Sequence, residues 1–264
     1  MPHNNAGSSA RLLAVLVIAP LLLFAFGAPA AAEDACNNLS LGFSGNRFRG
    51  GNQNISTVAQ VKANIESYNP YVTYYPPQYG DSSAWVMLTD QSGYAQAGYG
   101  KGAANNPPTI YDSVVFTEIQ DNDSPNWRRD YFDILYARNA FWFQTSTDRA
   151  GFWYFSFTDA NGPRILTSFS AAQGYLWTPN MIQLKGETLR YYGSDTNAGD
   201  QMVGDRGAST KVHFRYVNYA FDLRDNWIPA SLDYTPISTP RPQDNLYIYD
   251  GNTFAIWDGR CPNY

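Results

Sequence analysis

Short runs of β-branched and aromatic residues, separated by polar turn formers, occupy most of the chain after residue 80. The clearest example is Ser82–Gly100, which reads as two strands joined by a turn at Asp90–Gly93. Further runs follow at Tyr111–Ile119, Tyr131–Ala137, Phe141–Thr147, Gly151–Thr158, Arg164–Phe169, Met181–Tyr192, Lys211–Phe221, Leu246–Tyr249 and Phe254–Trp257. Strands at this spacing, with almost no helix between them, predict an all-β fold: an antiparallel β-sandwich or jelly roll.

One stretch favours a helix. In Ile55–Ser67, Val58, Val61 and Ile65 recur at helical spacing, and Ser56 or Thr57 is a suitable cap. The preceding residues are rich in Asn, Gly and Arg and lack periodicity. We therefore expect residues 33–69 to be an N-terminal segment with a short helix packed on the domain, and residues 70–264 to form the sandwich.

Residues 1–32 have the pattern of a secretory signal peptide. Arg11 provides a positive charge, Leu12–Phe26 an apolar run, and Ala28–Ala32 small residues for cleavage. No second long apolar run follows. The mature protein is therefore expected to be secreted, extracellular and free of the membrane after signal cleavage.

Cys36 and Cys261 are the two cysteines, one near each end of the mature chain. Because a secreted protein meets an oxidising environment, we predict that they form a disulfide bond. Closing so long a loop contributes about 4–5 kcal/mol in the chain-entropy treatment.

The composition narrows the range of binding and catalytic functions that the protein can have. The net charge is −5 and the chain has no run of basic residues, so the sequence does not indicate a nucleic-acid-binding surface. The mature chain has one histidine, His213, and no phosphate-binding or dinucleotide-binding glycine motif, so we expect no metal and no cofactor. Asp121–Asp123 and Asp250–Asn252 are acidic clusters that either bind calcium or form plain turns. Carboxylate chemistry remains the main enzymatic option, although no E-x-D-x-E pair of a glycosidase appears.

Several short motifs resemble those of the eqolisin-type glutamic peptidases, which are secreted acid endopeptidases with a concanavalin A-like β-sandwich. The motifs are Ser82–Val86, Gln96 within Tyr94–Tyr99, Phe116–Glu118, and Gly186–Glu187. The resemblance extends over residues 70–220 and consists of the order and spacing of these motifs. It implies that Glu187 is the general base and Gln96 the oxyanion donor, with Trp85, Glu118 and Tyr94 as substrate-binding residues.

The chain also departs from this family. Thr188 and Leu189 follow Glu187 where the family has a tryptophan and then an acid, and Met87–Asp90 replaces a Gly-Ile-Asp turn.

Three interpretations of the function therefore stay open. The first is a hydrolase acting on an extracellular polypeptide. The second is a lectin-like sandwich that binds a glycan or cell surface through tryptophans, with Trp127, Trp142, Trp153 and Trp177 as candidates. The third is a structural exoprotein.

Overall fold

The computed structural model describes residues 47–68, 70, 74–75, 78–102, 113–121, 127–134, 139–159, 161–170, 174–191, 211–235 and 244–258. The chain divides into two compact units, Met1–Ala35 and Cys36–Tyr264, and all described residues belong to the second. They form fifteen strands and no helix. The strands are β1 (Arg47–Asn54), β2 (Gln60–Glu66), β3 (Tyr74–Tyr75), β4 (Gln78–Thr89), β5 (Gly93–Gly102), β6 (Val114–Asp121), β7 (Trp127–Ile134), β8 (Ala140–Thr147), β9 (Phe152–Asp159), β10 (Gly162–Ser170), β11 (Met181–Tyr191), β12 (Val212–Ala220), β13 (Ile228–Pro229), β14 (Asp244–Asp250) and β15 (Thr253–Asp258).

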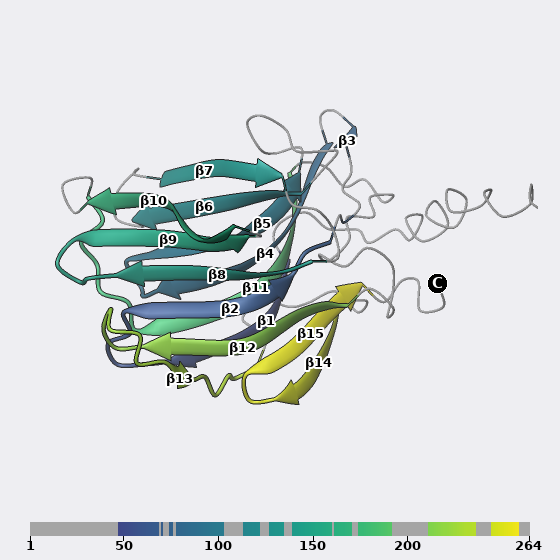
Figure 1. Ribbon diagram of the computed structural model, residues 1–264. Helices are drawn as coiled ribbons and strands as arrows, with labels where there is room; N and C mark the ends of the chain where they lie inside the picture. Colours follow the sequence, from purple (N-terminus) through teal and green to yellow (C-terminus); the bar gives the residue numbers. More distant parts are fainter. Residues whose placement is uncertain are drawn as a thin grey trace, which may run out of the picture. The chain divides into compact units, whose positions relative to one another are not determined.

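Two antiparallel sheets contain the described strands (Figure 1). Sheet A has the order β1-β11-β4-β5-β6-β7, with β3 paired to β4. Sheet B has the order β10-β9-β8-β2-β12-β15-β14, with β13 paired to β12. The expected all-β, antiparallel sandwich is thus confirmed.

The hydrophobic core lies between the two sheets, because one face of each contributes to a single cluster. Val86, Leu88 and Ile182 come from sheet A, and Phe143 and Phe214 from sheet B. Each fully buried apolar side chain of this size contributes about 1.5–3 kcal/mol. Strand alternation sends the neighbouring side chains of sheet A to its opposite face, which holds the candidate site.

The predicted hairpins are present. Asp90 accepts hydrogen bonds from the backbone N–H groups of Ser92 and Gly93 at 2.7 and 3.0 Å, which closes the turn between β4 and β5. Asp148 binds Ala150 and Phe152 in the same way between β8 and β9. An aspartate that caps its own turn is the reason why these positions could be found in the sequence.

The predicted helix over Ile55–Ser67 is wrong. Gln60–Glu66 forms β2, an inner strand of sheet B, and its burial alternates, with Val61, Ala63 and Ile65 in the core. Val61 and Ile65 fit both a helical and a strand period, and tertiary packing selects the strand. Residues before position 70 therefore supply a strand to each sheet, since β1 pairs with β11. The predicted signal peptide, Cys36 and Cys261 lie outside the described residues.

Candidate functional site

The candidate site residues lie on the face of sheet A that points away from sheet B, here called the outer face of sheet A. Ala84, Val86 and Leu88 of β4 face the core, so Trp85 and Met87 face outward. The register pairs Trp85 with Gly98 of β5 and with Lys185 of β11, and it pairs Gln96 with both Met87 and Glu118 of β6. Directly paired residues share a face, so Gln96, Glu118 and Glu187 are on the outer face together with Trp85.

Glu118 is the centre of a buried polar network. Its Oε1 accepts hydrogen bonds from the Tyr94 hydroxyl and from Trp127 Nε1, the latter at 2.9 Å. Its Oε2 accepts from Gln96 Nε2 at 3.2 Å and from Arg129 Nε, with which it forms an ion pair. The basic partner of Glu118 is Arg129, and Glu118 itself is only 4% exposed. Because two donors occupy each of its oxygens, Glu118 is poorly placed to activate water.

Gln96 joins this network through its amide nitrogen. Its Oε1 is buried and has no hydrogen-bond partner in the described part of the chain. A buried acceptor without a donor costs about 1–3 kcal/mol, so a donor brought by a ligand would remove that cost. Gln96 therefore keeps one amide oxygen that can accept a further hydrogen bond, although the residue is only 3% exposed.

Tyr94 stays protonated in this setting. Burial, followed by the charge of Glu118 and the hydrogen bond to it, raises the pKa of Tyr94 far above its usual value. Arg129 opposes that rise, and Glu187 adds to it. The Tyr94 hydroxyl is thus held as a hydrogen-bond donor, and the charge of Glu187 reaches this network electrostatically.

Glu187 lies in a different part of the outer face. Trp85, which is 1% exposed, donates from Nε1 to Glu187 Oε2 at 3.4 Å. This contact orients the carboxylate, while the Glu187 side chain itself is only half-buried. Of the two glutamates on the face, Glu187 is the one that solvent reaches.

Lys185 lies between Gln183 and Glu187 along the same strand face. It is 4% exposed, and its Nζ donates to Gln183 Oε1 at 2.8 Å. Burial lowers the pKa of Lys185 to about 8, and the charge of Glu187 partly offsets that decrease. At acidic pH this site therefore carries a buried ammonium beside the Glu187 side chain.

The register sets the separation of Gln96 and Glu187. Gln96 pairs with Met87, Glu187 pairs with Ser83, and β4 lies between their strands. Two strand spacings across and four residues along place their Cα atoms about 16 Å apart in a flat sheet. The residue of β11 opposite Met87 is Gln183. The structure thus brings Gln96 and Glu187 to one face, with their backbones two strands and four residues apart in the register.

A close backbone approach makes room for Trp85. A Cβ added to Gly98 would lie 2.0 Å from the Ala84 carbonyl oxygen and 2.7 Å from Trp85 Cβ. Only glycine fits at this position of β5. The indole of Trp85 packs with Met87 and Phe116 in a second apolar cluster, to which Tyr94 and Tyr131 add.

Several residues of the site were not identified from the sequence. Lys185, Trp127 and Arg129 carry much of the polar contact around Glu187 and Glu118. Trp127 and Arg129 alternate along β7, and this alternation could have placed them on one face.

The four tryptophans proposed as a glycan surface do not lie together. Trp153 and Trp177 are buried, with ring centroids 4.2 Å apart, and belong to the core. Trp127 is exposed on sheet A, and Trp142 is half-buried on sheet B. His213 binds Glu66 through Nδ1 and Tyr249 through Nε2, the latter at 3.0 Å, and lies on sheet B.

No described helix is long and apolar enough to cross a membrane. The described residues also contain no group of three or more His, Cys, Asp or Glu side chains that could hold a metal ion. Of the two acidic clusters, Asp123 is not described, and Asp250 caps its own turn by accepting from the Asn252 N–H at 2.8 Å.

Comparison with known proteins connects this fold to the glutamic peptidases. Scytalido-glutamic peptidase, solved with a transition state analog inhibitor, superposes with a TM-score of 0.57 at 13% identity, covering 81% of this chain and 98% of the peptidase. SCP-B, a member of the Eqolisin family solved with the tripeptide Ala-Ile-His, gives a TM-score of 0.51 at 11% identity with the same coverage. No family model and no curated protein matches the sequence. The chain therefore has the β-sandwich fold of the glutamic peptidases, and the remote resemblance seen in its motifs is confirmed.

Proposed function

We propose that this protein is a secreted hydrolase of the glutamic-peptidase type that cleaves polypeptides at acidic pH, with Glu187 as its general base. The observation that carries the proposal is the Glu187 carboxylate, oriented by Trp85 Nε1 and half-buried on the outer face of sheet A. A general base has to be fixed in direction and still reach a water molecule. Glu118 meets the first condition only, because four donors occupy its oxygens.

The reaction follows from this placement. Glu187 takes a proton from a water molecule whose oxygen attacks the peptide carbonyl carbon. A tetrahedral intermediate with a negative oxygen forms, and Glu187 then returns the proton to the leaving amine as the C–N bond breaks. The buried ammonium of Lys185, two residues away on the same strand face, supplies positive potential where that oxygen becomes negative.

Gln96 has a substrate-binding role in this proposal. An extended peptide advances about 3.3 Å per residue, so about five residues span the distance between Glu187 and Gln96 along the sheet. The unpartnered Oε1 of Gln96 accepts a backbone N–H of such a peptide once binding displaces the side chains that cover it. Gln96 is then a contact several residues from the scissile bond, rather than the donor to the oxyanion that the family resemblance implies.

The test is cleavage of an unstructured protein substrate across pH 2–7 by the mature protein and three variants. Glu187→Gln should abolish turnover, whereas Gln96→Ala should raise KM with a smaller effect on kcat. Glu118→Gln is the comparison variant, because it removes a second carboxylate from the same face, and circular dichroism checks that it is folded before its activity is measured. Activity that survives in the folded Glu187→Gln variant and disappears in the folded Glu118→Gln variant would show that Glu187 is not the general base.

A further inference from the structure

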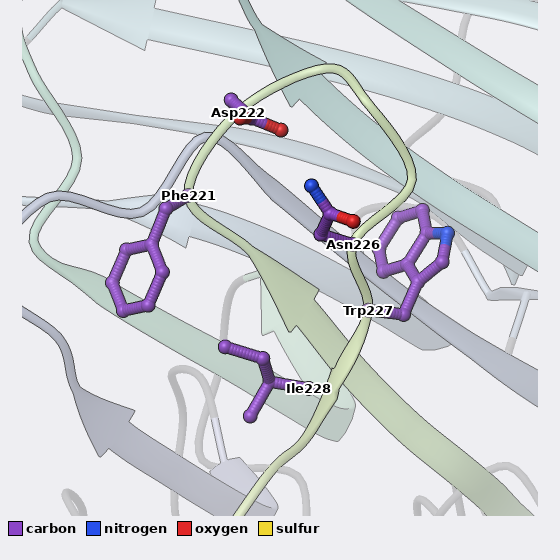
Figure 2. Close-up of a pocket in the computed structure, with 5 residues that line it drawn as sticks. All are labelled: Phe221, Asp222, Asn226, Trp227 and Ile228. Atoms are coloured by element: carbon purple, nitrogen blue, oxygen red, sulfur yellow. The ribbon is translucent and has the colours of Figure 1, made fainter.

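A second site lies on the other sheet, in the connection between β12 and β13. A cavity of about 350 Å³ opens there, lined by Phe221, Asp222, Asn226, Trp227 and Ile228. Figure 2 shows Phe221 and Trp227 on opposite sides of the loop, with Ile228 and the Asn226 amide between them. The volume lies at the lower end of the range for small-ligand pockets, and the lining is apolar with a few polar groups, as such pockets are.

The cavity continues into an aromatic surface on sheet B. Lys62 Nζ lies 3.7 Å from the ring centroid of Trp227 and 5.5 Å from that of Trp142. Trp142 in turn stacks on Tyr216, with centroids 6.2 Å apart and ring planes at 25°. The neighbours of Lys62 along β2, Val61 and Ala63, point into the core, so Lys62 is on the face that points away from sheet A. We call Trp142, Tyr216, Phe221 and Trp227 the sheet-B aromatic site.

An unusual backbone conformation at Tyr216 accompanies the exposure of its ring. Tyr216 has φ +53°, a conformation that costs a residue other than glycine about 1–3 kcal/mol. It lies at an irregularity in the pairing of β12 with β2, between Arg215 and Asn218, and the Asn218 side-chain amide donates to its carbonyl oxygen. As a result the Tyr216 side chain is 60% exposed instead of packed.

The Trp227 ring is also held in place. Its Nε1 donates to Asp225 Oδ1 at 3.1 Å, and Asp225 has φ +59°. Asp222 is fixed by accepting from the Arg224 backbone N–H at 2.9 Å, and its own carbonyl oxygen accepts from Gln60 Nε2 at 2.5 Å. The loop is therefore built around fixed side chains, which lowers the ordering cost of binding a ligand.

These features define the class of ligand. Flat, partly exposed rings beside amide and carboxylate groups complement a pyranose sugar, whose C–H faces are apolar and whose edges carry hydroxyl groups. Asn226 and Asp222 are placed to hydrogen-bond such hydroxyls. Burial lowers the pKa of Lys62 and the charge of Asp225 partly offsets that decrease, so a positive and a negative charge lie close together in the site.

We propose that the sheet-B aromatic site and the adjoining cavity bind an uncharged oligosaccharide. This site is on the sheet opposite the outer face of sheet A that carries Glu187, so it does not depend on the proposed peptidase activity. In a secreted protein it would anchor the molecule to a polysaccharide surface.

The experiment measures binding by the mature wild-type protein to insoluble cellulose, chitin and β-1,3-glucan, and to the soluble hexasaccharide of each by titration of tryptophan fluorescence. We expect at least one probe to bind, and Trp227→Ala and Tyr216→Ala to weaken that binding at least tenfold. Phe152→Ala is the matched control, since Phe152 is 47% exposed on β9 and stacks on Tyr154 outside this site. Circular dichroism checks the fold of each variant.

If Trp227→Ala fails to fold, Asn226→Ala takes its place, because the Asn226 side chain is exposed. The proposal is overturned if the folded wild-type protein binds none of the probes. It is equally overturned if the site variants bind as tightly as the wild type, or if Phe152→Ala weakens binding to the same extent. Peptidase activity of the same samples is measured separately and should be unchanged in all of these variants.

Discussion

Replacing Glu118 by glutamine removes the charge at the centre of the buried network and keeps the size of the side chain. Tyr94 and Trp127 can still donate to the remaining oxygen. The new amide faces Gln96, whose own amide can turn to offer its unpartnered Oε1. The Arg129 side chain, which is only 17% exposed, loses the carboxylate with which it forms an ion pair.

The expected loss of stability in Glu118→Gln follows from the Arg129 charge that the substitution leaves in place. Breaking a buried ion pair on one side costs about 3–5 kcal/mol. Arg129 keeps some solvent and lies over the ring of Phe116 at 4.8 Å, which places the expected loss at the lower end, about 3 kcal/mol. Urea unfolding at pH 7 measures this loss. The double variant with Arg129→Gln should cost less than the sum of the two single variants, since the two residues are in contact.

The matched control is Asp130→Asn, which breaks the ion pair of Asp130 with Arg128 on the same strand. That pair is solvent-exposed, with side chains 48% and 27% exposed, so its loss should cost at most about 1 kcal/mol. A loss below 1 kcal/mol for Glu118→Gln, similar to that of the control, would show that Glu118 is not the centre of a buried network.

Three further predictions concern stability. Burial lowers the pKa of Lys185 to about 8, so Lys185→Met should stabilise the fold by about 3 kcal/mol below pH 8. Urea unfolding measures this gain, which should vanish by pH 10.5. An equal gain at both pH values would contradict the prediction. Burial raises the pKa of Glu66, but His213 and Arg215 outweigh burial and lower it. Glu66→Gln should therefore destabilise at pH 7 and matter little below the folded-state pKa; a constant difference would refute this. Gly98→Ala should lower the Tm by forcing β4 and β5 apart, and an unchanged Tm would exclude that contact.

Most of the strands after residue 80 and their hairpins were predictable from the sequence because their signals are local. The turn at Asp90–Gly93 uses an aspartate that binds the backbone two and three residues later. β1 was missed, since Arg47–Asn54 is polar and contains Gly50 and Gly51, so it carries no apolar alternation. It is a strand because β11 pairs with it.

The face of each site residue was predictable, and their mutual distances were not. Alternation along β5 correctly places Tyr94, Gln96 and Gly98 on one side. The offset of Glu187 from Gln96 depends on the register of β11 against β4, two strands that are separated by more than 90 residues in the chain. Register between distant strands is fixed by core packing across the sheet and leaves no short-range signal.

The most direct test of the proposed function is the rate of peptide cleavage at acidic pH by wild-type protein and Glu187→Gln, purified and measured side by side. A positioned general base contributes about 10²–10⁴-fold to the rate, so the account predicts a loss of at least 100-fold with an unchanged fold. Cleavage by the variant at the wild-type rate, or no cleavage by the folded wild-type protein at any pH from 2 to 7, would contradict it.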